Sequence, residues 1–246
     1  MIPISDDDSD RKISPYVNYI IIVVNILVFI FLQKLGSNDG FTYSYSTVPG
    51  EILSGHDIVT HATIAHDPVS GQDVQIPGLG VTNLPVWLTL ITSMFMHGGI
   101  AHIAGNMLYL WVFGDNIENA LGHVRYLIFY LLCGIIASLS HVFSVHFLAG
   151  NELIPSLGAS GAISGVLGGY LLLFPKRRVN VFIIRALVPV PAYVALGFWI
   201  VLQVVSQMGL LGGGETGGGV AYAAHIGGFI AGLLLVKLMQ PREVYV

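Results

Sequence analysis

Apolar residues gather into six stretches along the chain, and charged residues lie between them. The first stretch lies between Lys12 and Lys34, and the second starts at about Ala101 and continues toward Leu121. The remaining four are bounded, in chain order, by Arg125 and Glu152, Glu152 and Lys176, Arg185 and Glu215, and Glu215 and Lys237. A helix needs roughly 20 apolar residues to cross a hydrocarbon core of about 30 Å, so the pattern predicts six transmembrane helices.

The composition supports the prediction of transmembrane helices. Of the 246 residues, 54% are hydrophobic and only 10% are charged, whereas a soluble domain carries about 25% charged residues. The chain has no basic stripe of the kind that binds nucleic acid, and its single cysteine, Cys133, excludes an intrachain disulfide. We therefore expect an all-α integral membrane protein in a lipid bilayer, with no nucleic-acid partner. No oligomeric state is predicted.

The distribution of Lys and Arg predicts the orientation. If all six stretches cross the membrane, nine of the ten basic residues fall on one side: Arg11, Lys12, Arg125, Lys176, Arg177, Arg178, Arg185, Lys237 and Arg242. Only Lys34 falls on the other side. Cytoplasmic loops carry the excess of basic residues, so both the N- and the C-terminus are predicted to be cytoplasmic.

A single domain is expected, a six-helix bundle over residues 13–240. Residues 1–12 are expected to form a short, solvated, acidic cytoplasmic tail, and residues 241–246 a short C-terminal tail. The outer loop, 36–84, is polar and rich in turn residues, and we expect a small cap there. The apolar segment 85–96 is expected to lie in the membrane interface.

In this topology, polar groups from three helices lie at similar depth near the outer side. His97 and His102 are at the start of the second helix, with Asn106 one turn further in. Ser160 is at the start of the fourth helix, and His225 is near the start of the sixth. Polar side chains in membrane spans are costly and face a cavity or the bundle interior, so these groups are expected to share one site, with His97 in a structural role.

Small residues predict which helices approach closely. Gly161, Gly165 and Gly169 follow Ser160 at four-residue spacing, and Ala224, Gly228 and Gly232 have the same spacing beside His225. Such stripes let helix backbones pack tightly in lipid. If the two stripes meet, Ser160 and His225 come within hydrogen-bonding reach.

The chemistry of these groups indicates roles. A serine hydroxyl becomes an effective nucleophile when a neighbouring base takes its proton, and His225 is the best-placed base. Asp115 and Glu118 lie at the inner end of the second helix, so a dyad is expected in place of a Ser-His-Asp triad. The Ser160 backbone N–H is one candidate donor to a tetrahedral oxyanion, and His102 and Asn106 are others.

Three motifs resemble those of the rhomboid intramembrane serine proteases. They are Gly158-Ala159-Ser160-Gly161, which resembles the GxSG nucleophile motif, His97-x4-His102-x3-Asn106, which resembles the second-helix signature, and Ala224-His225-x2-Gly228-x3-Gly232, which resembles the final-helix histidine motif. The resemblance covers about residues 85–235.

This resemblance implies the six-helix rhomboid core and hydrolysis through an acyl-enzyme without cofactor or metal. The implied substrates are transmembrane proteins, cut near their outer end by an extracytoplasmic site in the cell membrane (plasma or inner membrane). Ser160 and His225 carry over as the dyad, and His102 and Asn106 as oxyanion donors. In two respects the sequence departs from many family members. Ser164 stands where a tyrosine stacks on the catalytic histidine, and the Trp-Arg pair of the first outer loop is missing.

Other interpretations stay open at this stage. His56, His61 and His66 repeat every five residues and are weak candidates for metal ligands. The glycine-rich segment 212–219 is either a flexible linker or a mobile gate before the last helix. A non-catalytic membrane binding protein of the same fold would lack the serine or the histidine. A transporter would carry polar groups along the whole depth of the bundle.

Overall fold

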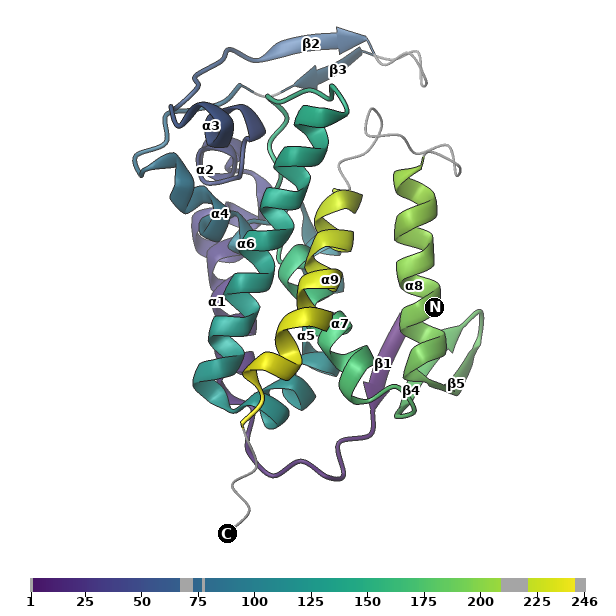
Figure 1. The fold of residues 1–246 in the computed structure, drawn as a ribbon. Coiled ribbons are helices and arrows are strands. Elements are labelled where there is room, and N and C mark those ends of the chain that lie inside the picture. The colour runs from purple at the N-terminus through teal and green to yellow at the C-terminus, as the bar shows by residue number, and fades with distance from the viewer. Residues whose placement is uncertain (1, 67–72, 77, 209–220, 242–246) are drawn as a thin grey trace.

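A computed structural model of the chain describes residues 2–66, 73–76, 78–208 and 221–241 (Figure 1). Its α-helices are α1 (Tyr16–Leu27), α2 (Asp39–Ser44), α3 (Pro49–Ser54), α4 (Thr89–Thr92), α5 (Ile100–Leu121), α6 (His123–Phe147), α7 (Ser160–Leu173), α8 (Ala192–Gln207) and α9 (Tyr222–Met239). Shorter helical segments are the π-helix η1 (Val28–Leu32) and the 3-10 helices η2 (Lys34–Gly36), η3 (Val86–Leu88) and η4 (Ser93–Phe95). The strands are β1 (Ile2–Asp6), β2 (Thr63–His66), β3 (Asp73–Ile76), β4 (Arg178–Ile183) and β5 (Ala186–Pro191).

A helix is present at each of the six predicted positions, so the protein is mainly helical. By length and composition, α6 and α9 are each able to cross a membrane alone. A third span results if the segment Val86–Phe95 is joined to α5 across a bend of 82°. The other apolar helices of the described residues, Tyr16–Leu32, α7 and α8, are shorter than a full span.

Helices α7 and α9 pack against each other so closely that backbone meets backbone. A methyl group placed at Gly228 would lie 2.1 Å from the carbonyl oxygen of Gly161, and one at Gly232 would lie 1.9 Å from that of Gly165. Only glycine fits at these two positions of α9. The predicted contact between the two small-residue stripes is therefore confirmed.

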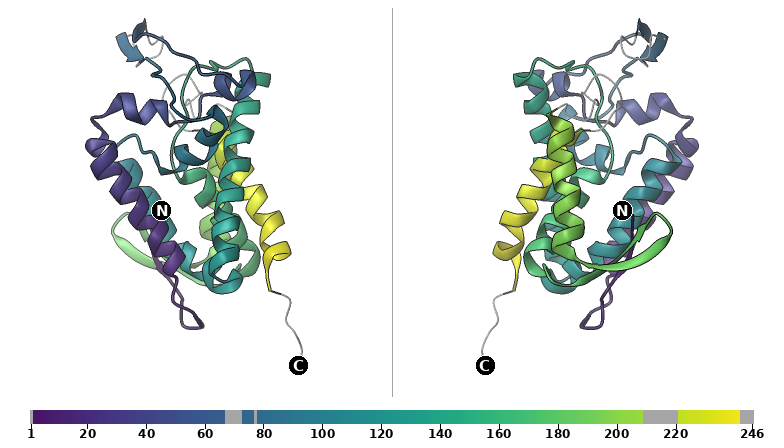
Figure 2. Two further views of the ribbon diagram at one scale, coloured as in Figure 1. Left: turned by 90° about the vertical axis from the view of Figure 1, so that its left-hand side faces the viewer. Right: turned by 90° about the vertical axis from the view of Figure 1, so that its right-hand side faces the viewer.

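Strands add to the bundle at both of its ends (Figures 1 and 2). At one end β2 and β3 pair as an antiparallel hairpin. Together with α2 and α3 they form the expected cap of the loop 36–84, which is joined to the segment before α7 by hydrogen bonds between Thr47 and Ser156. Near the other end β1, β4 and β5 form a three-stranded antiparallel sheet in the order β1-β4-β5.

Most side chains of residues 2–12 are exposed, as expected for a solvated segment, but its first residues form strand β1 and not a free tail. Strand β1 pairs with β4, and Pro3 lines a small apolar cavity with side chains of α5 and α8. The alternating side chains of β4 explain the pairing, since Val179 and Val181 are buried beneath the sheet. The chain is thus not purely helical.

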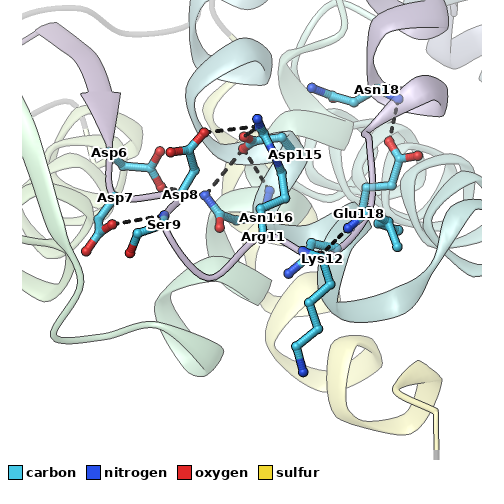
Figure 3. Close-up of polar contacts among 12 residues, drawn as sticks. Asp6, Asp7, Asp8, Ser9, Arg11, Lys12, Asn18, Asp115, Asn116 and Glu118 are labelled. Atoms are coloured by element: carbon cyan, nitrogen blue, oxygen red, sulfur yellow. Dashed lines mark hydrogen bonds and ion pairs between the residues drawn. The ribbon is translucent and has the colours of Figure 1, made fainter.

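Polar contacts hold the following N-terminal segment against the end of α5 (Figure 3). Arg11 donates to Asp115 at 2.9 Å. The carboxylate of Glu118 accepts the backbone N–H groups of Val17 and Asn18, the first turn of α1, at 3.0 and 2.7 Å. An acidic group at a helix N-terminus satisfies donors that lack intrahelical partners. This explains why Glu118 is fully buried and yet paired.

Candidate active site

Ser160 is the first residue of α7, and the backbone before it is shaped by glycine. Gly158 has a φ of +126°, which side-chain-bearing residues rarely adopt. A methyl group at this position would also lie 2.9 Å from Nε2 of His102. The turn therefore brings Ser160 to the helix N-terminus, where its backbone N–H has no intrahelical acceptor.

His225 lies in the first turn of α9 and faces Ser160 across the close helix pair. Its Nε2 is 2.8 Å from Oγ of Ser160, within hydrogen-bonding range. The two residues are 65 positions apart, and the glycine contacts of α7 and α9 bring them together. The predicted approach of the serine and the histidine is present.

The other ring nitrogen of His225 has a partner that the sequence did not predict. Its Nδ1 is 2.7 Å from Oε1 of Gln203 on α8. The ring of Trp199, one turn earlier on α8, lies 5.9 Å from the imidazole between centroids, tilted by 37°. A signal was available, because Gln203 is an amide within the apolar run of α8 and polar side chains in spans face the bundle interior.

His102 and Asn106 lie on one face of α5 beside the turn before Ser160. The backbone N–H of Gly98 donates to Nδ1 of His102 at 3.3 Å, which leaves Nε2 as the protonated nitrogen of a neutral ring. Asn106 is 8% exposed, and its Nδ2 has no hydrogen-bond partner among the described residues. Both side chains thus offer an N–H group beside Gly158.

All four predicted site residues line one cavity of about 830 Å³: Ser160, His225, His102 and Asn106. Trp199 also lines it, and the rest of its wall includes small or apolar residues such as Ala137 and Met94. A volume of this size suits a ligand or a peptide segment. The cavity therefore combines a serine hydroxyl, an imidazole and N–H donors with apolar walls.

Three other predicted groups lie apart from this chemistry. His97 is completely buried, and its ring packs edge-on against His102 at 5.2 Å. Ser164 donates to the carbonyl oxygen of Ser160 at 2.6 Å, within its own helix. Asp115 and Glu118 are engaged with the N-terminal segment, and the described part of the chain places no carboxylate on His225.

The structure does not support the loop histidines as metal ligands, and it does not describe the glycine-rich segment. Among the described residues no group of three or more His, Cys, Asp and Glu side chains is arranged to hold a metal ion. His56 bonds locally to Ser54, and the side chain of His66 lies outside the described residues. The glycine-rich segment 212–219 also lies outside them.

Comparisons with known proteins agree with the motif pattern. The model of the Rhomboid domain family matches residues 85–242. The chain is 35% identical over 150 residues to "Rhomboid protein 1, mitochondrial" of Saccharomyces cerevisiae, covering 60% of this chain and 40% of the relative. It is 38% identical over 140 residues to "Rhomboid protease GluP" of Bacillus subtilis, covering 56% and 26%. A human relative, "Presenilin-associated rhomboid-like protein, mitochondrial", is 31% identical over 147 residues, covering 60% and 36%. The chain thus matches well under half the length of each of these relatives.

Proposed function

The chain belongs to the rhomboid family, and we propose that it is a serine endopeptidase that cuts peptide bonds in or near transmembrane segments of membrane proteins. The observation that carries the proposal is the 2.8 Å contact between Oγ of Ser160 and Nε2 of His225, inside a cavity lined by free N–H donors. Proteolysis by the relative "Rhomboid protease GluP" supports the same reaction class.

The proposed reaction runs through an acyl-enzyme. His225 Nε2 takes the proton of Ser160 as Oγ attacks the carbonyl carbon of the scissile bond. The protonated imidazole then gives that proton to the departing amine, and the peptide C–N bond breaks. Water, deprotonated by His225, attacks the acyl carbon, and the proton returns to Oγ as the carboxylic acid leaves. No cofactor or metal is needed for this sequence.

The negative charge on the tetrahedral oxygen needs donors that are already in place. We assign this role to the Ser160 backbone N–H, His102 Nε2 and Asn106 Nδ2. The free amide of Asn106 is the strongest support, because a buried donor without a partner costs about 1–3 kcal/mol in stability. An oxyanion would supply the missing acceptor.

Rhomboid family members are multi-pass membrane proteins, and we propose the full six-span arrangement for this chain. Residues 13–240 would form the membrane domain, with residues 1–12 and 241–246 on the cytoplasmic side. The site would open to the extracytoplasmic side of the cell membrane. Two of the relatives compared above carry mitochondrial names and one is bacterial, so this location is tested by fractionation of cells that express the chain.

The dyad is tested by labelling the purified protein in detergent with a fluorophosphonate probe. We expect the wild type to be labelled at one site and Ser160→Ala not at all. His225→Ala should label at least about 100-fold more slowly, since general base catalysis contributes about 10²–10⁴-fold. Cleavage of a model transmembrane substrate should follow the same order.

Thermal unfolding of the three proteins controls for loss of fold. Equal labelling of all three folded proteins would exclude the dyad. A folded wild type that neither reacts with the probe nor cleaves a substrate would favour the non-catalytic binding protein of the same fold.

A further inference from the structure

His225 requires a partner that fixes both its tautomer and its ring orientation. A neutral imidazole carries its proton on either nitrogen, and only the tautomer with a free Nε2 accepts the Ser160 proton. In a Ser-His-Asp triad a carboxylate selects this tautomer. The described residues offer His225 no carboxylate, but they do offer Gln203 at 2.7 Å from Nδ1.

We propose that Gln203 is the positioning residue of this active site, an amide in the place where a triad has an acid. The proposal rests on the Ser160–His225 dyad proposed above. Oε1 of an amide only accepts hydrogen bonds, so the nitrogen facing it must carry the proton. Nδ1 therefore donates to Gln203, and Nε2 keeps its lone pair toward Oγ of Ser160 at 2.8 Å. One contact selects the base form of the imidazole.

The same helix also holds the plane of the ring. Trp199 and Gln203 are four residues apart on α8 and therefore lie on one face. The Trp199 ring lies against both His225, at 5.9 Å, and Phe229, at 6.2 Å, and these two are one turn apart on α9. Ser164 on α7 bonds instead to its own helix. Aromatic support for the histidine thus comes from α8 and not from α7.

A neutral partner has a chemical consequence that distinguishes it from an acid. A carboxylate stabilises the protonated imidazole strongly, because opposite charges attract across a poorly screened distance. An amide oxygen offers only a dipole, so it fixes the tautomer while adding less to the basicity of His225. It also avoids placing a second charge in a membrane-spanning bundle, where ionised groups are costly.

Two substitutions separate positioning from packing. Gln203→Met keeps the length of the side chain and removes the acceptor, whereas Gln203→Glu keeps an acceptor and adds a charge. By analogy with the partners that orient metal-bound histidines, Gln203→Met should lower kcat and the rate of fluorophosphonate labelling about 10- to 100-fold. KM should stay near the wild-type value, because Gln203 touches the base and not the substrate.

Gln203→Glu should restore most of the activity lost in Gln203→Met, with a changed pH dependence. The new carboxylate favours the protonated imidazole, so the acid limb of the kcat/KM profile should move to higher pH by about one unit or more. A residue that only fills space would not produce this shift. Val201→Met, at an exposed position of α8 two residues before Gln203, is the matched control and should behave as the wild type.

Thermal unfolding of all variants keeps the outcome interpretable. If wild type reacts with the probe and folded Gln203→Met reacts equally fast, Gln203 has no positioning role. An unshifted acid limb in active Gln203→Glu would also overturn the proposal. If the wild type does not react with the probe at Ser160, the proposed dyad is wrong, whatever Gln203 does. This result differs from the one that overturns only the role of Gln203.

Discussion

The amide of Asn106 combines burial with an unused donor. Its side chain is 8% exposed, and Nδ2 finds no acceptor among the described residues. Nearly all buried polar groups in folded proteins are hydrogen-bonded, and an exception needs an explanation such as a catalytic role or a bound water. Asn106 lines the same cavity as Ser160, and its Nδ2 would lie 3.7 Å from a methyl group placed at Gly158. In the proposed reaction, the oxyanion of the substrate would supply the missing acceptor.

We therefore expect Asn106→Ala to keep the fold and weaken turnover. Loss of one oxyanion donor typically lowers kcat by about 10²–10³-fold, and removal of an unpaired buried amide should not lower stability. The measurement is cleavage of a model transmembrane substrate together with thermal unfolding in the same detergent. Asn106→Asp, which has the same shape without the donor, is the control and should be equally slow. Unchanged cleavage in Asn106→Ala would remove this residue from the mechanism.

At the scale of single residues, the sequence predicted the site residues that belong to a motif, but it missed the residues that contact His225 from α8. Ser160 and His225 stood out because hydroxyl and imidazole groups near helix starts are rare in apolar stretches. Gln203 and Trp199 did not, because their contact with His225 depends on how α8 turns about its axis. That rotation is decided by packing against α9, which the spacing of residues within α8 does not determine.

At the scale of the elements, the α7–α9 contact sets the distance between the proposed nucleophile and its base. Gly161 and Gly228 meet at the level of the site, and Gly165 and Gly232 meet one turn deeper. Overpacking a dense interior costs about 1–3 kcal/mol and displaces backbone. Moving the two helices apart would lengthen and weaken the 2.8 Å contact between Oγ of Ser160 and Nε2 of His225.

Gly228→Ala is therefore expected to lower both Tm and the rate of probe labelling. Its methyl group would lie 2.1 Å from the carbonyl oxygen of Gly161, and backbone does not yield there without moving the helix. Gly197→Ala is the matched control, a helical glycine of α8 whose methyl group would meet no atom within 4 Å. Its Tm should equal or exceed that of the wild type. Equal behaviour of the two variants would show that helix separation does not limit the site.

The sequence predicted elements whose residues lie close together along the chain, and it missed those that depend on distant residues. Apolar length and charge placement located the six helices, because a helix satisfies its own backbone. The sheet β1-β4-β5 was missed, since β1 and β4 are about 170 residues apart in sequence. The acidic run that follows β1 indicated a solvated tail. Asp7 and Asp8 in this run are exposed and contact Ser9 and Arg11 nearby in sequence, but Asp10 pairs with Arg177, which only the fold brings near.

At the scale of the whole molecule, the N-terminal segment contacts α5, α7 and the residues that follow α7. Asp6 accepts hydrogen bonds from Asn116 of α5, at 2.8 Å, and from the hydroxyl of Tyr170 on α7. Arg177, after α7, pairs with Asp10 at 2.5 Å. This segment therefore links α5, α7 and the sheet at the end of the bundle opposite the cap.

Asp6 makes this link dependent on pH. Burial raises the pKa of Asp6 from 3.8 to about 7, against the lowering effect of the Tyr170 hydrogen bond. The unfolded chain then loses this proton at lower pH than the folded chain does. The stabilising contribution of protonated Asp6 is fully present below pH 3.8 and is lost as the pH rises to about 7. Asp6→Asn, which cannot ionise, should keep this stabilising contribution at every pH in this range.

The excess of the Asp6→Asn Tm over the wild-type Tm should therefore grow from about pH 4.5 to pH 7 and level off above. Asp7→Asn is the matched control, because Asp7 is exposed and hydrogen bonds from Ser9 lower its pKa. Its difference from wild type should not grow over the same range. A constant difference for Asp6→Asn would mean that Asp6 is already ionised in the folded protein. An ionised Asp6 would then add to the charged contacts of Arg11 and Arg177, and the attachment of the segment would respond to salt more than to pH.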